Sequence, residues 1–135
     1  MIDVEHILKD AGLVAADAAG QVDGEDVIVN LGAGLVTGNL VVDVTAIEIA
    51  SNDEKYAIKL QGSSESDFAD TIEDLAIIEL GAAEVLGGDL DSDTGRYIVP
   101  FRTERNGVIY PYARLYTDVS GAIATGINFS AYLGK

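Results

Sequence analysis

Residues 108–133 read VIYPYARLYTDVSGAIATGINFSAYL, and this stretch decides the fold class. Ile127, Phe129, Ala131 and Leu133 alternate with other residues at the period of two that places side chains on one face of a β-strand. In residues 108–119 the same period predicts a second strand, and Ser120-Gly121 predicts the turn between the two. In that earlier strand Tyr110, Tyr112, Arg114 and Tyr116 fall on one face, while Ile109, Ala113, Leu115 and Thr117 fall on the other.

Working outward, Asn106-Gly107 is a strong hairpin signal, and it predicts that residues 108–119 pair with a strand over residues 96–103. Pro100 inside that strand has no N–H to donate, so we expect an edge position or a bulge. Earlier strands are predicted at Val27–Leu31, Leu40–Ala50, Tyr56–Gln61, Phe68–Ile72 and Leu75–Leu80. The apolar pattern of residues 40–50 changes face near Thr45, which predicts a β-bulge there. Short strands separated by frequent turns predict a mainly β fold, an antiparallel β-sandwich or jelly roll.

The N-terminal segment has a different pattern. Its small and apolar residues recur at spacings of three and four, namely at Val4, Ile7, Leu8, Ala11, Ala15 and Ala18. That spacing predicts a short helix, although Gly12 weakens it. An extended arm that packs on a neighbour is the alternative. We therefore expect an N-terminal arm or short helix over residues 1–26, joined to a β-sandwich over residues 27–135 in one structural domain.

Composition excludes several classes of protein. The chain has 135 residues, a formal net charge of −15 and no cysteine, so disulfides and thiolate sites are absent. Such an acidic chain repels nucleic-acid phosphates and anionic lipid, so we expect neither nucleic acid nor membrane as a partner. No apolar run approaches the length of a membrane span.

Candidate chemistry is sparse. His6 is the only histidine, and it predicts an ordinary polar position rather than a catalytic base. Asp89, Asp91 and Asp93 followed by Gly95 resemble the start of a calcium loop, but the glycine is one place late and Pro100 stands where the closing glutamate belongs. A solvated turn explains these aspartates better. We expect no enzyme activity, metal or cofactor; a soluble ligand-binding β-sandwich module, with or without calcium dependence, is the alternative function.

The charge is unevenly distributed along the chain. All four arginines and five of the six tyrosines lie after residue 95, whereas only two of the 23 acidic residues, Glu104 and Asp118, do. Tyrosine and arginine dominate protein interfaces, and a positive strip on a negative domain suits self-assembly or an acidic partner. The predicted interface residues are Arg96, Arg102, Tyr110, Tyr112, Arg114 and Tyr116. The alternative is an amphipathic face packed within the monomer.

Two stretches resemble the capsid cement (decoration) proteins of short-tailed bacteriophages. The first is Arg96–Arg102 with Glu104, Asn106-Gly107 and residues 112–116; the second is residues 121–133, similar to the closing strand of that family. The likeness is good over the last 40 residues, while residues 8–11 and 27–32 match loosely.

This resemblance implies a jelly-roll-like fold and a homodimer or homotrimer on the outer surface of an icosahedral capsid. There the protein would bridge major capsid protein subunits and stabilise the shell against internal DNA pressure. It would be made in the host bacterial cytoplasm and become part of the virion. The family has no catalytic residues to carry over, and its contact residues are not fixed by a motif.

Overall fold

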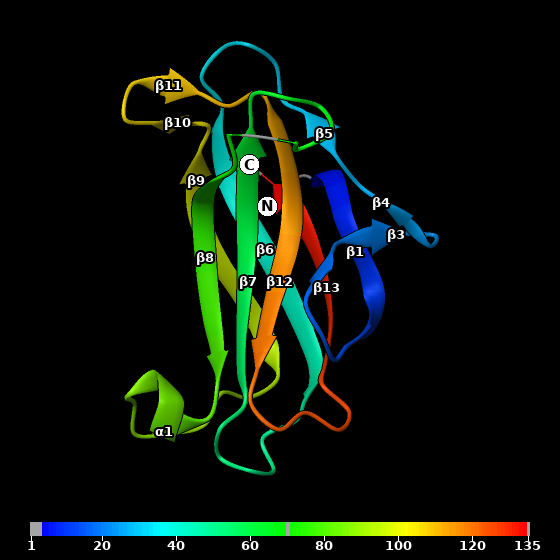
Figure 1. The fold of residues 1–135 in the computed structure, drawn as a ribbon, viewed down its shortest axis with the longest axis vertical. Helices are drawn as coiled ribbons and strands as arrows, with labels where there is room; N and C mark the ends of the chain where they lie inside the picture. The colour runs from blue at the N-terminus through cyan, green and yellow to red at the C-terminus, as the bar shows by residue number, and fades with distance from the viewer. Residues whose placement is uncertain (1–3, 70, 135) are drawn as a thin grey trace.

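The computed structural model describes residues 4–69 and 71–134, which form two antiparallel β-sheets packed face to face (Figure 1). The first sheet contains, in spatial order, β1 (Val4–Val14), β13 (Ile127–Gly134), β6 (Thr37–Ile47) and β9 (Gly95–Arg102). In the second sheet, β7 (Lys55–Ser63) lies between β8 (Glu73–Gly81) and β12 (Tyr112–Ser120). The predicted mainly β sandwich is confirmed.

Short elements complete the fold. β2 (Ala18–Ala19) and β5 (Val29–Asn30) both pair with the free side of β12. Two small hairpins consist of β3 (Gln21–Val22) with β4 (Glu25–Asp26), and of β10 (Glu104–Arg105) with β11 (Val108–Ile109). Helix α1 (Ala83–Leu86) is a single turn in the link between β8 and β9. It lies at the opposite end of the sandwich from β10 and β11 (Figure 1).

The core lies between the sheets and follows the period of two. Every second residue of β7, from Tyr56 to Leu60, is fully buried, as is every second residue of β13 from Ile127 to Ala131. Their neighbours face outward because successive strand side chains alternate between the two faces. Burying these large apolar side chains supplies the main stabilisation of the fold.

Residues 4–14 correct the N-terminal helix prediction, since they form the edge strand β1, paired with β13. The pairing shifts register between Val4 and His6, between Ile7 and Lys9, and between Lys9 and Gly12. Each shift adds a residue to β1, and repeated bulges break the period of two. Apolar residues then recur at spacings of three and four, which read in sequence as a helix. Leu8 is fully buried in the sandwich core, so β1 is an integral strand.

The predicted long hairpin is also wrong, although its turn is correct. Asn106 and Gly107 have φ angles of 53° and 82°, the left-handed values of a two-residue hairpin turn. Only β10 and β11 pair around that turn, whereas β9 pairs with β6 and β12 pairs with β7. The chain crosses from the first sheet to the second between residues 103 and 111. A turn signal fixes the local bend but not the sheet that each longer strand joins.

Two further predictions have opposite outcomes. The bulge near Thr45 is confirmed, because Val44 pairs with Phe129 and Ala46 pairs with Asn128, which leaves Thr45 as the extra residue. The strand predicted over Phe68–Ile72 is wrong, since its described residues have no strand pairing. Phe68 and Thr71 both have a φ of 54°, in the left-handed region that an extended strand excludes.

Candidate interaction surfaces

The six predicted interface residues do not form one strip. Tyr97, Val99 and Phe101 of β9 pack against the core, so Arg96 and Arg102 point outward from the first sheet. Ala113, Leu115 and Thr117 of β12 are buried. The alternate residues Tyr112, Arg114 and Tyr116 therefore point outward from the second sheet. Because the two sheets pack face to face, the arginines of β9 and the residues of β12 lie on opposite sides of the molecule.

Tyr110 belongs to neither outer face. Pro111 separates β11 from β12, and the alternation predicted across residues 108–119 is interrupted there. Tyr110 packs against the core, and its backbone N–H donates to the carbonyl of Thr103 at 2.8 Å. The same side chain lies so close to Gly62 that a Cβ there would fall 2.9 Å from the Tyr110 Cβ. Tyr110 therefore helps to close one end of the sandwich.

Arg114 makes its contacts within the chain. Its guanidinium carbon lies 4.5 Å from the centre of the Phe68 ring and 5.1 Å from the centre of the Tyr116 ring. Its Nε donates to Gln61 Oε1 at 3.0 Å. Phe68 is only 5% exposed, although it belongs to the irregular segment between β7 and β8. Arg114 thus packs against Phe68 of this segment while it contacts Tyr116 and Gln61 on the outer face of the second sheet, and these cation–π contacts and the hydrogen bond stabilise the segment there.

Arg96 is paired on the other face of the molecule. It donates from Nε and Nη2 to the two carboxylate oxygens of Asp43 at 2.7 and 3.1 Å. The hydrogen bond to Asp43 holds the pKa of Arg96 above its ordinary value. About half of the Arg96 side chain is exposed, so this bidentate pair contributes little to stability. It does fix the two side chains beside an apolar row.

That apolar row crosses the outer face of the first sheet. Strand pairing places Ile7 beside Tyr132, Tyr132 beside Val41, and Val41 beside Ile98. Val41 is fully buried although it points away from the core, while Ile7 and Ile98 are 53% and 49% exposed. Exposed apolar side chains therefore lie at both ends of the row, with Tyr132 partly exposed between Ile7 and Val41, and an apolar outer face of this kind suits protein binding. The row contains one residue from each of the four strands, so sequence order does not reveal it.

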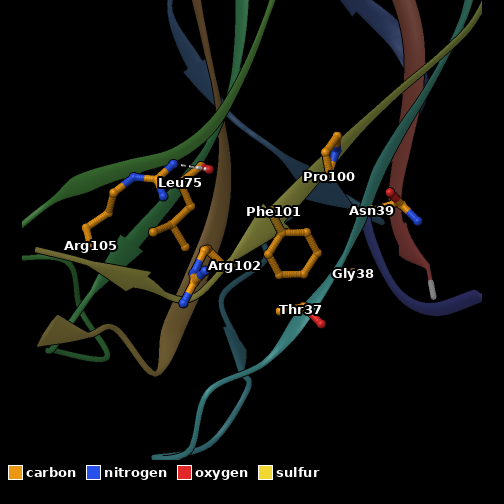
Figure 2. Close-up of a pocket in the computed structure, with 8 residues that line it drawn as sticks. All are labelled: Thr37, Gly38, Asn39, Leu75, Pro100, Phe101, Arg102 and Arg105. Carbon is orange, nitrogen blue, oxygen red and sulfur yellow. Dashed lines mark hydrogen bonds between the residues drawn. The ribbon is translucent and has the colours of Figure 1, made fainter. Parts of the chain in front are cut away.

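A groove opens along the β8 and β9 edge of the sandwich, at the end nearest β10 (Figure 2). Its volume is about 750 Å³. Leu75, Pro100 and Phe101 provide apolar surface, and Arg102 and Arg105 provide positive charge. Thr37, Gly38 and Asn39 of β6 complete the lining. Sequence analysis had identified Arg102 as an interface residue but missed Arg105.

Arg105 covers backbone that the sheet leaves unpaired. The pairing of β7 with β8 shifts between Ala76 and Asp74, which makes Leu75 the extra residue of a bulge. Arg105 donates to the carbonyl of Leu75 at 2.6 Å (Figure 2) and to that of Asp74 at 3.3 Å. Bulges leave such carbonyls without a strand partner. Arg105 satisfies them and holds one wall of the groove.

Two glutamates organise the opposite end of the sandwich. Glu48 accepts backbone hydrogen bonds from Gly126, Thr125 and Ala124, and these donors lower its pKa. The carboxylate of Glu54 is fully buried, and burial opposes its ionisation, but backbone N–H groups including that of Ser51 outweigh burial and lower its pKa as well. Both carboxylates hold loops together, which is a structural use of charge.

Tyr56 links this end to the core. Its hydroxyl donates to the carbonyl of Glu48 at 2.9 Å. Burial, followed by the nearby charges of Glu48 and Glu54, raises the pKa of Tyr56 to about 12. The phenol therefore stays protonated near neutral pH and keeps donating.

Lys9 is a functional position that sequence analysis did not single out. Its Nζ donates to the carbonyls of Asp10, Gly12 and Phe129 at 2.9, 2.9 and 2.8 Å, and lies 4.5 Å from the centre of the Phe129 ring. Burial lowers its pKa. Lys9 stabilises the bulged part of β1 by filling all three of its donor positions. A single lysine followed by Asp10 carries no sequence signal for this role.

The aspartate loop does not form a metal cage. Asp91 accepts from the backbone N–H of Ala83 at 2.8 Å, and Asp93 accepts from that of Thr94 at 2.7 Å. Across residues 4–69 and 71–134, no group of three or more histidine, aspartate or glutamate side chains is placed to hold a metal ion. His6 lies in β1, beside Leu133 of β13.

No family model matches the chain, and no curated protein is detectably similar to it. The fold places the chain among antiparallel β-sandwich domains. In the described part of the chain, no helix is long and apolar enough to cross a membrane.

Proposed function

We propose that this chain is a structural virion protein, a capsid cement or decoration protein. It oligomerises and bridges major capsid protein subunits on the outer surface of the shell. The observation that carries the proposal is the apolar row of Ile7, Tyr132, Val41 and Ile98 on the outer face of the first sheet. The resemblance of residues 96–133 to cement proteins supports the choice of a capsid as the partner. Two of the four strands of the first sheet, β9 and β13, lie largely within these residues.

Physical reasoning favours this role for an acidic sandwich. A packaged genome pushes capsid subunits apart, and an oligomer that contacts several subunits adds several attachments at once. The effective concentration of the second attachment makes the combined binding strong. A charge of −15 opposes contact with DNA and suits the outside of the shell. The rigid face of a four-stranded sheet also binds with little loss of conformational entropy.

The test uses capsids assembled from the major capsid protein encoded beside the gene for this chain. Purified protein is added, and binding is measured by co-sedimentation together with the heat resistance of the capsid. Ile98→Glu should reduce binding at least tenfold, because it places a charge in the apolar row. Ile77→Glu is the matched control, since Ile77 is 44% exposed on the outer face of the second sheet and Ile98 is 49% exposed.

The proposal fails if the wild-type chain does not bind these capsids, or binds them without raising their resistance to heat. Equal effects of Ile98→Glu and Ile77→Glu would show that binding does not use the outer face of the first sheet. Absence of a capsid gene from the neighbourhood of this gene would also count against it.

A further inference from the structure

Two features at opposite ends of the β8 and β9 edge are complementary to each other. One is the groove lined by Arg102, Arg105, Phe101, Pro100 and Leu75. The other is the loop Asp89-Leu90-Asp91-Ser92-Asp93, in which Leu90 is 84% exposed. No other large apolar side chain in the described part of the chain is so exposed. An apolar side chain flanked by acids suits an apolar hollow flanked by arginines.

Charge distinguishes this groove from other hollows of the surface. Among the described residues, none that lines it is acidic. Asp17, by contrast, lines three other hollows, one of them at β1 and another at the outer face of β7 and β8. Arg102 and Arg105 therefore give this groove a positive lining on a chain whose formal net charge is −15. Arg102 is half exposed, and its Nε pairs with Glu104 at 3.2 Å.

The walls of the groove favour insertion of a side chain over addition of a strand. Thr103 N–H donates to the carbonyl of Val36, so this pair, which extends the ladder of β9 and β6, is hydrogen-bonded. Hydrogen-bonded pairs alternate along an antiparallel ladder. The backbone groups of Ile98, Pro100 and Arg102 therefore point away from β6, toward the free edge of the sheet. Pro100 has no N–H, so the edge cannot offer a continuous ladder. On the β8 side, Arg105 already occupies the carbonyls of Asp74 and Leu75.

The exposed loop is held in position. Ser92 N–H donates to the carbonyl of Gly81 at 2.9 Å, and Gly81 N–H donates to the Ser92 hydroxyl at 3.0 Å. Tyr97 donates from its hydroxyl to the carbonyl of Asp93 at 2.6 Å. On the preceding side, Gly88 N–H donates to the carbonyl of Ala83 at 3.1 Å. Asp89 and Leu90 project between Gly88 and Ser92, without side-chain partners among the described residues. Presenting Leu90 on an anchored loop reduces the entropy lost on binding.

The loop and the groove of one molecule cannot meet. β8 and β9 run between them, and nine residues of strand span about 26 Å. In Figure 1, α1 and the following link lie at one end of the sandwich, and β10 lies at the other. Contact therefore needs a second copy.

We infer that the Asp89–Asp93 loop of one copy inserts Leu90 into the Arg102/Arg105 groove of another copy of this chain. The interface is head-to-tail, so each copy uses one surface to bind and a different surface to be bound, and the association closes into a ring or grows as a chain. This inference deepens the proposed function by naming the contact through which the protein oligomerises. The contact itself does not depend on the proposed function; only the purpose of self-association, which is to bridge capsid subunits, rests on it.

The test measures the mass of the purified full-length chain by light scattering coupled to size exclusion, in the absence of any capsid. Wild type should exceed the chain mass of 14.1 kDa. Leu90→Asp and Arg102→Glu should each reduce the mass to that of a single chain. Leu13→Asp is the matched control: Leu13 is 56% exposed on β1, far from both surfaces, and its variant should associate like wild type.

Mixing the two variants separates a lost contact from a lost fold. Leu90→Asp retains an intact groove, and Arg102→Glu retains an intact loop. An equimolar mixture should therefore form a heterodimer of twice the chain mass and no larger species. A wild type that stays at 14.1 kDa, or a mixture that stays monomeric, overturns the inference. Because no capsid is present, either result leaves the capsid-binding measurement with Ile98→Glu to decide the proposed function separately.

Discussion

Substituting Arg114 with alanine should loosen the segment between β7 and β8 and destabilise the whole domain. Two cation–π contacts, to Phe68 and Tyr116, contribute about 0.5–1 kcal/mol each at this partly buried site. The hydrogen bond to Gln61 contributes about 1 kcal/mol. The sum predicts a loss of about 2–3 kcal/mol in the free energy of unfolding. For a domain of this size that corresponds to a decrease of about 8–12 °C in Tm.

The assay is urea denaturation, combined with amide hydrogen exchange resolved by segment. Arg114→Ala should accelerate exchange in residues 64–72 more than in β13, because the segment loses its fastening before the core opens. Arg114→Lys should recover part of the stability, since a lysine keeps the charge but not the planar stacking and the fork of donors. Arg96→Ala is the matched control, because its exposed pair with Asp43 should be worth less than about 1 kcal/mol.

The same measurements distinguish two roles of Arg114, a contact in an interface and a stabilising contact within the chain. If Arg114 serves an interface only, Arg114→Ala will alter association and leave the stability of the monomer close to that of Arg96→Ala. That result would refute the stacking argument. If the stacking argument holds, any loss of assembly in Arg114→Glu will accompany a loss of stability, and it cannot by itself identify a contact surface.

Three further predictions concern the end of the sandwich that contains Glu48, Glu54 and the aspartate loop. Tyr56→Phe removes the hydroxyl that donates to the carbonyl of Glu48 and should cost about 1–3 kcal/mol, measured by urea denaturation, because the acceptor loses its partner. Since the folded-state pKa values of Glu48 and Glu54 are lowered, their contribution to stability is present above the ordinary glutamate value of 4.5 and is lost as pH falls through the lower folded values. Tm should therefore be level near neutral pH and decrease in acid, and Glu48→Gln should flatten that decrease; an unchanged acid profile would contradict this. Calcium should leave Tm unchanged, because Asp91 and Asp93 already accept backbone N–H groups; an increase on titration would restore the calcium-dependent alternative.

Local patterns predicted the parts of this fold that depend on local chemistry. The alternation from Tyr56 to Gln61 identified the inward face of β7, and the change of face near Thr45 located a bulge within β6. Asn106-Gly107 located the turn between β10 and β11. Each of these features follows from the φ, ψ and side-chain direction of neighbouring residues, which the sequence specifies directly.

Pairing between distant strands was not predictable in this way. Residues 96–103 and 108–119 are adjacent in sequence and both alternate, yet β9 and β12 join different sheets. A period of two is the same whichever sheet a strand enters. The predicted Tyr/Arg strip failed to form one surface for this reason: its members were grouped by sequence position, whereas the sandwich separates Arg96 and Arg102 from the residues on β12.

The apolar row could not be predicted from the sequence, for a related reason. Ile7, Tyr132, Val41 and Ile98 are separated by many residues and become neighbours only through register. Ile7 was further obscured by the bulges of β1, which imitate helical spacing. Arg105 was missed because its role depends on an extra residue in β8, Leu75, which lies 30 positions away and to whose carbonyl Arg105 donates.

The apolar row and the groove consist of different residues, which leads to a further prediction. Capsid docking uses Ile7, Tyr132, Val41 and Ile98, whereas self-association uses Leu90 and the groove that begins at Pro100, two positions after Ile98 on β9. A self-associated protein then docks through several rows at once, and avidity of this kind is worth about 100-fold or more. Leu90→Asp should therefore bind capsids about 100-fold more weakly than wild type, although its apolar row is intact. As a control, both proteins are immobilised at low density as isolated chains, and each should then bind with the same affinity through its single row. Equal capsid affinity of Leu90→Asp and wild type would show that self-association does not contribute to docking.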